Sequence, residues 1–225
     1  MTHFIKDAQL PDCTLCKNSR VLVYGENVAQ CGCARKGKPL MRFLETTVGT
    51  EFSDTNFHTI TPMDDLQAKS LKRLSDFIKW WEPSKAGLYL WSPSTGNGKT
   101  MLAAGVINEL GLASQAIEAS VLWDALRSCY DSGEPQKRYL NVVMYTPALL
   151  LDDLGMGNTE KADEWLTDIL NARIARGLLT IITSNIHPSQ LPKASQRAIS
   201  RIMAHTHPLR LVSETDWRVK LSKHV

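Results

Sequence analysis

The sequence has no long apolar run, no internal repeat and no low-complexity segment, and its charges are close to balanced. No stretch approaches the about 18 apolar residues that a membrane-spanning helix needs, and the first residues lack the apolar core of a signal peptide. We therefore expect a cytoplasmic protein with no membrane partner. The formal net charge is only +3, far below the strong basic excess expected for high-affinity binding to nucleic acid.

Cysteine is scarce and unevenly placed. Four of the five cysteines lie near the start of the chain, as the pairs Cys13/Cys16 and Cys31/Cys33 with fourteen residues between them. In a reducing cytosol such pairs favour metal binding over disulfides, and four thiolates suit a tetrahedral Zn²⁺. We predict a small zinc-binding module over residues 1–45. Unpaired or redox-active cysteines are the alternative.

A strand that runs into a glycine-rich loop is the most informative motif. Residues 87–91 are apolar and continue into Ser-Pro-Ser-Thr-Gly-Asn-Gly-Lys-Thr at 92–100. In a P-loop, glycines let backbone N–H groups approach the phosphates of a nucleotide. The apolar helix expected over 101–110 presents its N-terminus to the same anion. The predicted nucleotide-binding residues are Thr95, Gly96, Asn97, Gly98, Lys99, Thr100 and Met101.

The loop departs from the consensus G-x-x-x-x-G-K-[ST] at one place, because Pro93 stands where the first glycine is expected. That glycine serves the turn and does not contact the γ-phosphate, so the phosphate-binding end is intact. There, we predict that Lys99 contacts the β- and γ-phosphates and that Thr100 binds Mg²⁺. An ordinary turn between a strand and a helix is the alternative for this segment taken by itself.

Two further apolar runs end in polar residues, as buried parallel strands do. Residues 148–151 are followed by Asp152 and Asp153, and residues 178–183 lead to Asn185. In P-loop ATPases an acid at such a strand end holds Mg²⁺ and its neighbour orients the attacking water. We predict the metal role for Asp152, the water role for Asp153 and a nucleotide sensor at Asn185. Surface turns are the alternative for each pair alone.

Three apolar strands separated by helical stretches indicate an α/β fold with a central parallel sheet flanked by helices, and a ligand site at its carboxyl edge. Residues 46–62 are interpreted as a linker and approach to the core, and 63–225 as the ATPase domain. The spacing of apolar residues predicts a helix over 63–81. Trp80 and Trp81 lie on this helix and are interpreted as packing residues, with base stacking as the alternative.

Taken in order, these motifs resemble the AAA+ helicase loaders of the DnaC/DnaI type. The resemblance covers nearly the whole chain, from the cysteine module and Phe-Ser-Asp-Thr-Asn-Phe at 52–57 to Thr-Ile-Ile-Thr-Ser-Asn at 180–185. It implies a AAA+ ATPase that uses ATP or ADP and Mg²⁺, with slow hydrolysis that depends on an oligomer, DNA or a partner. It also implies that the N-terminal module binds the hexameric DnaB-type replicative helicase, which the loader delivers onto single-stranded DNA in replication initiation.

The resemblance implies roles for further residues. Residues 196–202 match the family's arginine-finger helix, with Arg201 as the finger and Arg197 as the competing candidate. A finger from a neighbouring subunit completes the γ-phosphate site, which implies self-association head to tail into a ring or spiral. Arg218 corresponds to a sensor-2 arginine that acts within its own subunit. Arg173 also matches a family arginine, whose role is left open.

Two other functions fit parts of the chain. An IstB-type transposition helper ATPase shares the core motifs and assembles on duplex DNA, but such helpers lack a cysteine module. A non-enzymatic zinc adaptor with a structural nucleotide would not need an intact Lys99, Asp152 and Asn185. The basic residues considered for DNA contact, each also compatible with a solvated surface, are Lys36, Lys38, Arg42, Lys137 and Arg138.

Overall fold

The computed structural model describes residues 21–24, 27–30, 52, 55–62, 64–82, 87–112, 114–129, 134–155, 159–191 and 196–212. Several residues singled out above lie outside this part of the chain: Cys13, Cys16, Cys31, Cys33, Lys36, Lys38, Arg42 and Arg218, together with the side chains of Lys137 and Arg138. Among the helices of the described residues, none has the length and apolar character needed to cross a membrane.

The elements follow one another in an alternating pattern after a short N-terminal hairpin. The strands are β1 (Val21–Tyr24), β2 (Asn27–Gln30), β3 (Gly87–Trp91), β4 (Ser114–Glu118), β5 (Ala148–Asp152), β6 (Leu179–Ser184) and β7 (Thr206–Arg210). The helices are α1 (Asp65–Trp80), α2 (Lys99–Glu109), α3 (Ala119–Ser128), α4 (Glu134–Tyr145), α5 (Glu160–Ile174) and α6 (Gln196–His205), with 3-10 turns η3 (Phe57–Thr59) and η5 (Pro188–Gln190).

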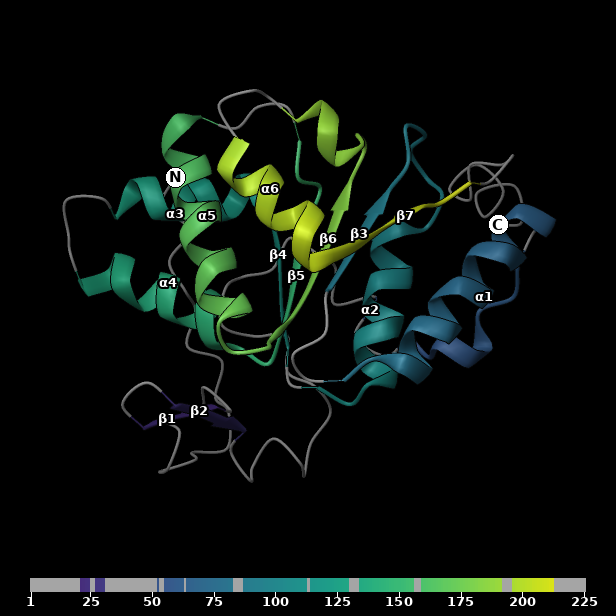
Figure 1. The fold of residues 1–225 in the computed structure, drawn as a ribbon, viewed down its shortest axis with the longest axis horizontal. Coiled ribbons are helices and arrows are strands. Elements are labelled where there is room, and N and C mark those ends of the chain that lie inside the picture. The colour runs from purple at the N-terminus through teal and green to yellow at the C-terminus, as the bar shows by residue number, and fades with distance from the viewer. Residues whose placement is uncertain are drawn as a thin grey trace, which may run out of the picture.

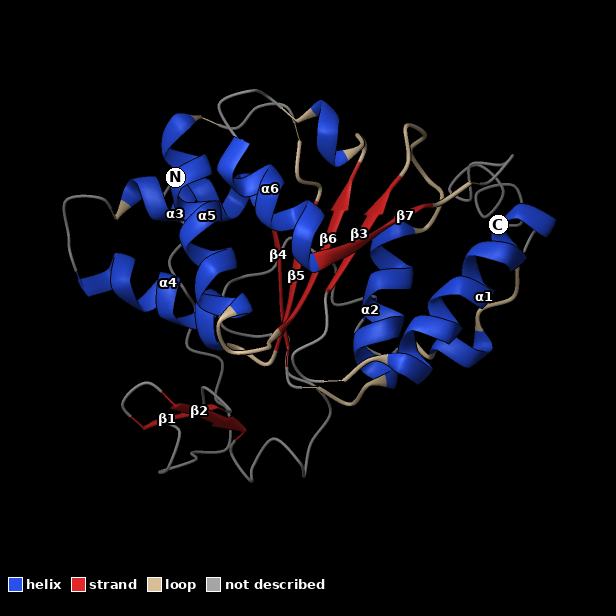
Figure 2. Cartoon of the chain, in the orientation of Figure 1, coloured by secondary structure: helices blue, strands red, loops and turns tan. Residues whose placement is uncertain are grey.

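A five-stranded parallel sheet in the order β4-β5-β6-β3-β7 forms the centre of the fold. Helices α1 and α2 cover one face of this sheet, and α3, α4, α5 and α6 cover the other (Figure 1; Figure 2). The predicted α/β architecture with a parallel sheet flanked by helices is therefore confirmed.

Both faces of the sheet are buried, which explains why its central strands are continuously apolar. In β5, Leu149 and Leu151 belong to the core shared with α3 to α6, whereas Ala148 and Leu150 belong to the core shared with α1 and α2. The strand ends at Asp152, which is only partly buried. The apolar run thus carries the chain to the carboxyl edge, where the charged residues begin.

The two edge strands of the sheet are absent from the sequence prediction. β4 reads Ser-Gln-Ala-Ile-Glu and β7 reads Thr-His-Pro-Leu-Arg, so neither offers the apolar run that revealed the other strands. Pro208 in β7 is compatible with an edge, because a proline donates no hydrogen bond to a neighbouring strand. The sheet is therefore wider than the sequence indicates.

The helix predicted over 63–81 is present as α1, and Asp64 caps it by accepting a hydrogen bond from the backbone N–H of Gln67 at 2.7 Å. Trp81 packs against the core formed with α2, as expected for a packing residue. Trp80 does not: its side chain is 73% exposed. The interpretation of Trp80 as a packing residue is wrong, because the apolar stripe of α1 faces the sheet and Trp80 falls on the opposite, polar side.

The N-terminal hairpin lies between the two cysteine pairs in the sequence. β1 and β2 pair antiparallel, with Val21 opposite Gln30 and Tyr24 opposite Asn27. Because the first residue of β1 faces the last residue of β2, the chain enters and leaves the hairpin at the same end.

Candidate nucleotide-binding site

The glycine-rich loop joins β3 to α2 at the carboxyl edge of the sheet. Gly96 and Gly98 adopt the left-handed conformation, with φ of 69° and 79°, which side chains with a Cβ rarely adopt. Gly98 is also the N-cap of α2 and offers no side chain to cap it. The first N–H groups of α2 are therefore the kind of donors that bind an anion.

Pro93 fits this loop without the expected first glycine. The left-handed residues of the loop are Gly96 and Gly98, so position 93 does not need the conformational freedom of a glycine. The turn around Pro93 is closed by a side chain, because Ser92 Oγ accepts a hydrogen bond from the backbone N–H of Ser94 at 3.3 Å. The departure from the consensus therefore alters the start of the loop and leaves its phosphate-binding end unchanged.

Lys99 and Asn97 face each other inside the loop. Lys99 Nζ donates to the backbone oxygen of Ser94 at 3.1 Å and to Asn97 Oδ1 at 3.3 Å. Asn97 is only 3% exposed, and its Nδ2 has no hydrogen-bond partner among the residues that the structure describes. A buried donor without an acceptor is costly, and a phosphate oxygen is an acceptor of the right kind. The loop therefore fits a nucleotide phosphate.

Asp152 connects the end of β5 to the start of α2. Its Oδ1 and Oδ2 accept hydrogen bonds from Thr100 Oγ1 at 2.9 and 3.1 Å, and its Oδ1 accepts another from Thr183 Oγ1 at 2.6 Å. Burial raises the pKa of Asp152, and the two hydroxyls only partly oppose this effect. The predicted Mg²⁺ pair, Thr100 and Asp152, is thus in direct contact, with a hydroxyl and a carboxylate as oxygen donors.

Asp153 and Asn185 are joined in the same way. Asn185 Nδ2 donates to Asp153 Oδ1 at 2.8 Å, and the backbone N–H of Asp153 donates to Thr183 Oγ1 at 2.9 Å. Asp153 has φ of 51° and is the one non-glycine residue with positive φ in the described part of the chain. Such strain is kept where surrounding contacts enforce it, and it clusters at functional sites. The strand end therefore holds both aspartates in fixed directions.

Thr183 is the residue that the sequence analysis missed. Its hydroxyl donates to Asp152 and accepts from the backbone of Asp153, so one side chain positions both aspartates. The only signal in the sequence was its place two residues before Asn185.

Hydrogen bonds from buried hydroxyl groups hold the segment after β6 in place. Ser184 Oγ donates to the backbone oxygen of Leu154 at 2.5 Å and accepts from the N–H of Ile186 at 3.1 Å. Tyr89 donates its phenolic proton to the backbone oxygen of Ile186 at 3.0 Å, and burial raises the pKa of Tyr89 to about 12. Asn185 lies between these anchored residues, so its backbone is held on both sides.

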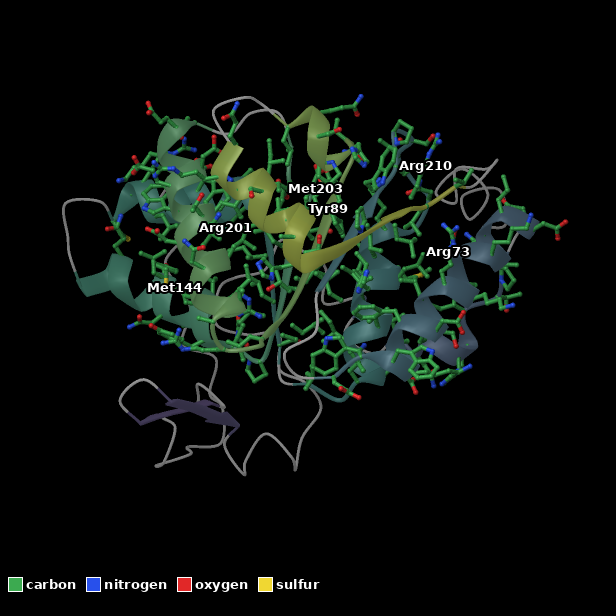
Figure 3. All side chains as sticks on the ribbon, in the orientation of Figure 1. Arg73, Tyr89, Met144, Arg201, Met203 and Arg210 are labelled. Carbon is green, nitrogen blue, oxygen red and sulfur yellow. The ribbon has the colours of Figure 1, made fainter. Side chains whose placement is uncertain are left out.

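Arg201 does not join this cluster within its own chain. It lies on α6, on the side of the molecule that carries α5 (Figure 3), and its Nε donates to Asn171 Oδ1 at 2.8 Å. Arg197, one turn earlier on α6, is exposed. Of the two finger candidates, Arg201 is thus the one held by a neighbouring helix.

Arg173, whose role was left open, is a buried structural residue. It donates from Nε to Thr180 Oγ1 at 2.8 Å and from Nη1 to the backbone oxygens of Val143 and Thr146 at 2.8 and 2.9 Å. Its Nη2 donates to the backbone oxygen of Leu179. Burial lowers the pKa of Arg173 to about 9, so the side chain remains charged at neutral pH and ties the end of α4 to the start of β6.

Comparison with known proteins agrees with this geometry. No protein-family model matches the chain. The replicative helicase loader DnaI of Bacillus subtilis (strain 168) is 28% identical over 202 residues, which are 80% of this chain and 63% of that protein. A crystal structure of DnaI is 27% identical, with a TM-score of 0.64 over 74% of this chain and 96% of that one. The chain is therefore similar in sequence and fold to a helicase loader of the DnaI type.

A crystal structure of the DnaC helicase loader shares the fold, with a TM-score of 0.61, 22% identity and coverage of 73% of this chain and 100% of that one. The chain spans about 63% of the length of the Bacillus subtilis relative.

Proposed function

We propose that this protein is an ATP-dependent loader, which binds a hexameric replicative DNA helicase and delivers it onto single-stranded DNA during replication initiation. One joint observation carries the proposal: a chain similar to a replicative helicase loader also brings Thr100, Asp152 and Asn185 to one edge of its sheet through a continuous set of hydrogen bonds. The similarity supports the loader function over a transposition helper, and the intact site supports an ATPase over a non-enzymatic adaptor.

In this proposal each residue of the site has its own role in binding or hydrolysing ATP. Lys99 and the N–H groups that follow Gly98 hold the phosphates, and Asn97 Nδ2 gains the acceptor that it lacks. Thr100 and Asp152 would hold Mg²⁺, which would supply positive charge beside the phosphates. Asp153 orients the attacking water. Asn185, already bonded to Asp153, is placed to link the state of the γ-phosphate to that water. The sensor-2 role proposed for Arg218 lies outside the described residues.

Arg201 is proposed to act on the nucleotide of a neighbouring subunit. In the described part of the chain its guanidinium is engaged only through Nε, by Asn171. The terminal fork of an arginine, Nη1 and Nη2, is the part that binds phosphate oxygens in a bidentate way. This arrangement supports Arg201 over Arg197 as the finger, and with it self-association head to tail in a ring or spiral.

The N-terminal module over residues 1–45 is proposed to bind Zn²⁺ through its four cysteines and to contact the helicase. The antiparallel hairpin of β1 and β2 supports this proposal, because Cys31 directly follows the last residue of β2 and the other pair precedes β1. The cysteine pairs themselves lie outside the described residues. Zinc would supply stability that so short a segment cannot obtain from a hydrophobic core.

Affinity capture with the replicative helicase of the same organism, with and without ATP, tests the loader proposal. We expect ATP to strengthen formation of a complex with the wild-type protein, and the Lys99→Ala variant to lose this dependence on ATP while its zinc content is unchanged. Nucleotide affinity equal to wild type in that variant would contradict the P-loop assignment. Absence of helicase binding together with ATP-dependent assembly on duplex DNA would support the transposition helper instead.

Metal analysis of the protein purified without chelator tests the N-terminal module. We expect one equivalent of zinc per chain, and we expect the Cys13→Ser/Cys16→Ser variant to lose it. That variant should bind the helicase less tightly and ATP as well as the wild type, because the cysteines and the P-loop belong to separate parts of the chain. A wild-type protein without zinc would refute the module.

A further inference from the structure

Helix α1 carries a stripe of exposed basic residues that the proposed ATPase site does not use. Lys69, Lys72, Arg73 and Lys79 are all exposed, and their spacing places them on one side of the helix, opposite the buried Leu74. From Lys69 to Lys79 the stripe extends over about 15 Å, given a rise of 1.5 Å per residue. Two acidic residues, Asp65 and Asp76, are exposed on the same side of the helix.

These cations are not satisfied by neighbouring carboxylates. None of the four forms an ion pair within the described residues, although Asp76 lies three residues after Arg73 and four after Lys72. Other exposed helical cations behave differently: Arg127 pairs with Asp124 at 2.5 Å, and Lys161 with Glu164 at 2.6 Å. The charges of α1 are therefore available to an external anion, whereas those of α3 and α5 are already engaged.

An aromatic residue ends the stripe. Trp80 follows Lys79 directly, and its side chain is 73% exposed, so a large apolar surface faces water beside the cations. Lysines and arginines suit the phosphates of any nucleic acid, but an indole can stack only on a base whose face is open. A single strand offers such bases, and a duplex does not. The combination favours single-stranded nucleic acid over duplex DNA and over an acidic protein surface.

We propose that the exposed stripe of α1, formed by Lys69, Lys72, Arg73, Lys79 and Trp80, binds single-stranded nucleic acid. Figure 3 labels Arg73 beside α1, and its side chain is exposed. On its inner side α1 packs in the same core as α2, the helix that begins at Lys99. This inference rests on the proposed function, because a loader must contact DNA. It places that contact on α1 and not on the basic residues of the N-terminal module.

Fluorescence anisotropy with a labelled oligothymidylate and the full-length protein tests this surface. We expect Lys69→Gln/Lys72→Gln to weaken binding and to reduce the slope of log affinity against log salt by about 1.4, since each phosphate contact to a single strand contributes about 0.7. The matched control, Arg127→Gln/Lys161→Gln, also removes two exposed helical cations and should bind as the wild type does.

Replacement of Trp80 tests the stacking. Trp80→Ala should lose about 5-fold or more in affinity for the oligothymidylate and nothing for a duplex, and Trp80→Phe should recover most of the loss. If the lysine and tryptophan variants both bind single strands as the wild type does, the assignment to α1 is overturned. The proposals for ATP and helicase binding would not be affected by that result. Equal losses for single strand and duplex overturn the stacking role, and loss of helicase capture with unchanged DNA binding identifies the stripe as a protein-binding surface instead.

Discussion

Two charged side chains near the two ends of strand β6 have opposite surroundings. Arg173 contacts the start of the strand and donates to four oxygens, three of them backbone carbonyls. Asp152 contacts the end of the strand and receives only hydroxyl protons, from Thr100 and Thr183. The cation donates to four oxygen acceptors, whereas the anion has no cation beside it within the described residues.

This difference separates a structural charge from a functional one. Hydrogen bonds to a charged group contribute about 1.5–3 kcal/mol each, so Arg173, with four of them, stabilises the joint between α4, α5 and β6. Burial of Asp152 disfavours its ionised form, as its raised pKa indicates. A carboxylate kept in such a place is expected where a bound cation such as Mg²⁺ completes it. Residues of this second kind cost stability and are retained for function.

The largest effect on stability is expected from Arg173→Met. This change leaves the carbonyls of Val143, Thr146 and Leu179 without their donor, and we expect a loss of at least about 3 kcal/mol in the free energy of unfolding. Urea denaturation followed by circular dichroism measures it. Arg127→Met, on the exposed side of α3, is the control and should change stability by less than about 0.5 kcal/mol. A loss below about 1 kcal/mol for Arg173→Met would contradict a structural role.

Removal of the charge at the other end of β6 should affect activity without lowering stability. We expect Asp152→Asn to lower ATP hydrolysis about 100-fold or more, because a Mg²⁺ ligand is worth several kcal/mol in the transition state. Stability without Mg²⁺ should not fall, since the amide oxygen still accepts from Thr100 and Thr183. Hydrolysis is measured with helicase and single-stranded DNA present, and thermal melting without them. Asp168→Asn, on the exposed side of α5, is the control.

Thr183 is expected to matter for both stability and activity, because it is buried and also contacts both aspartates. Thr183→Val removes one donor to Asp152 and one acceptor from the backbone of Asp153, and we expect a loss of about 1–3 kcal/mol in the free energy of unfolding. The Mg²⁺ concentration for half-maximal hydrolysis should rise as well. Thr183→Ser keeps the hydroxyl and should restore both values; a serine variant as impaired as the valine variant would show that the methyl packing matters instead.

The sequence predicts the parts of this site that depend on local pattern. Apolar runs that end in Asp152 or Asn185 reveal both strands and the edge at which they meet, and the glycines reveal the loop. What depends on the pairing of strands could not be predicted: Thr183 becomes important only because β5 and β6 are neighbours in parallel register. Edge strands such as β7, with a proline and few apolar residues, carry too weak a pattern. The exposure of Trp80 follows from how α1 packs, which a list of apolar positions does not fix.

The smallest and most specific effect concerns pH. Because the pKa of Asp152 is raised in the folded protein, the folded state holds this proton more tightly than the unfolded chain does. The stability that the protonated carboxyl contributes is therefore present at pH values below its ordinary pKa and is lost as the pH rises through the raised one.

The difference in unfolding free energy between the wild type and Asp152→Asn isolates this group, because every other titration occurs in both proteins. We expect the wild type to lose stability relative to Asp152→Asn as the pH rises from about 4 towards neutrality. The difference should then stay constant at higher pH. Saturating ATP and Mg²⁺ should reduce the effect, since a bound cation favours the ionised carboxylate that burial disfavours. If this difference does not change with pH in the nucleotide-free protein, solvent reaches Asp152 and burial does not disfavour its charge. Asp152 would then differ from Arg173 because it is more exposed, and not because its site lacks a bound cation.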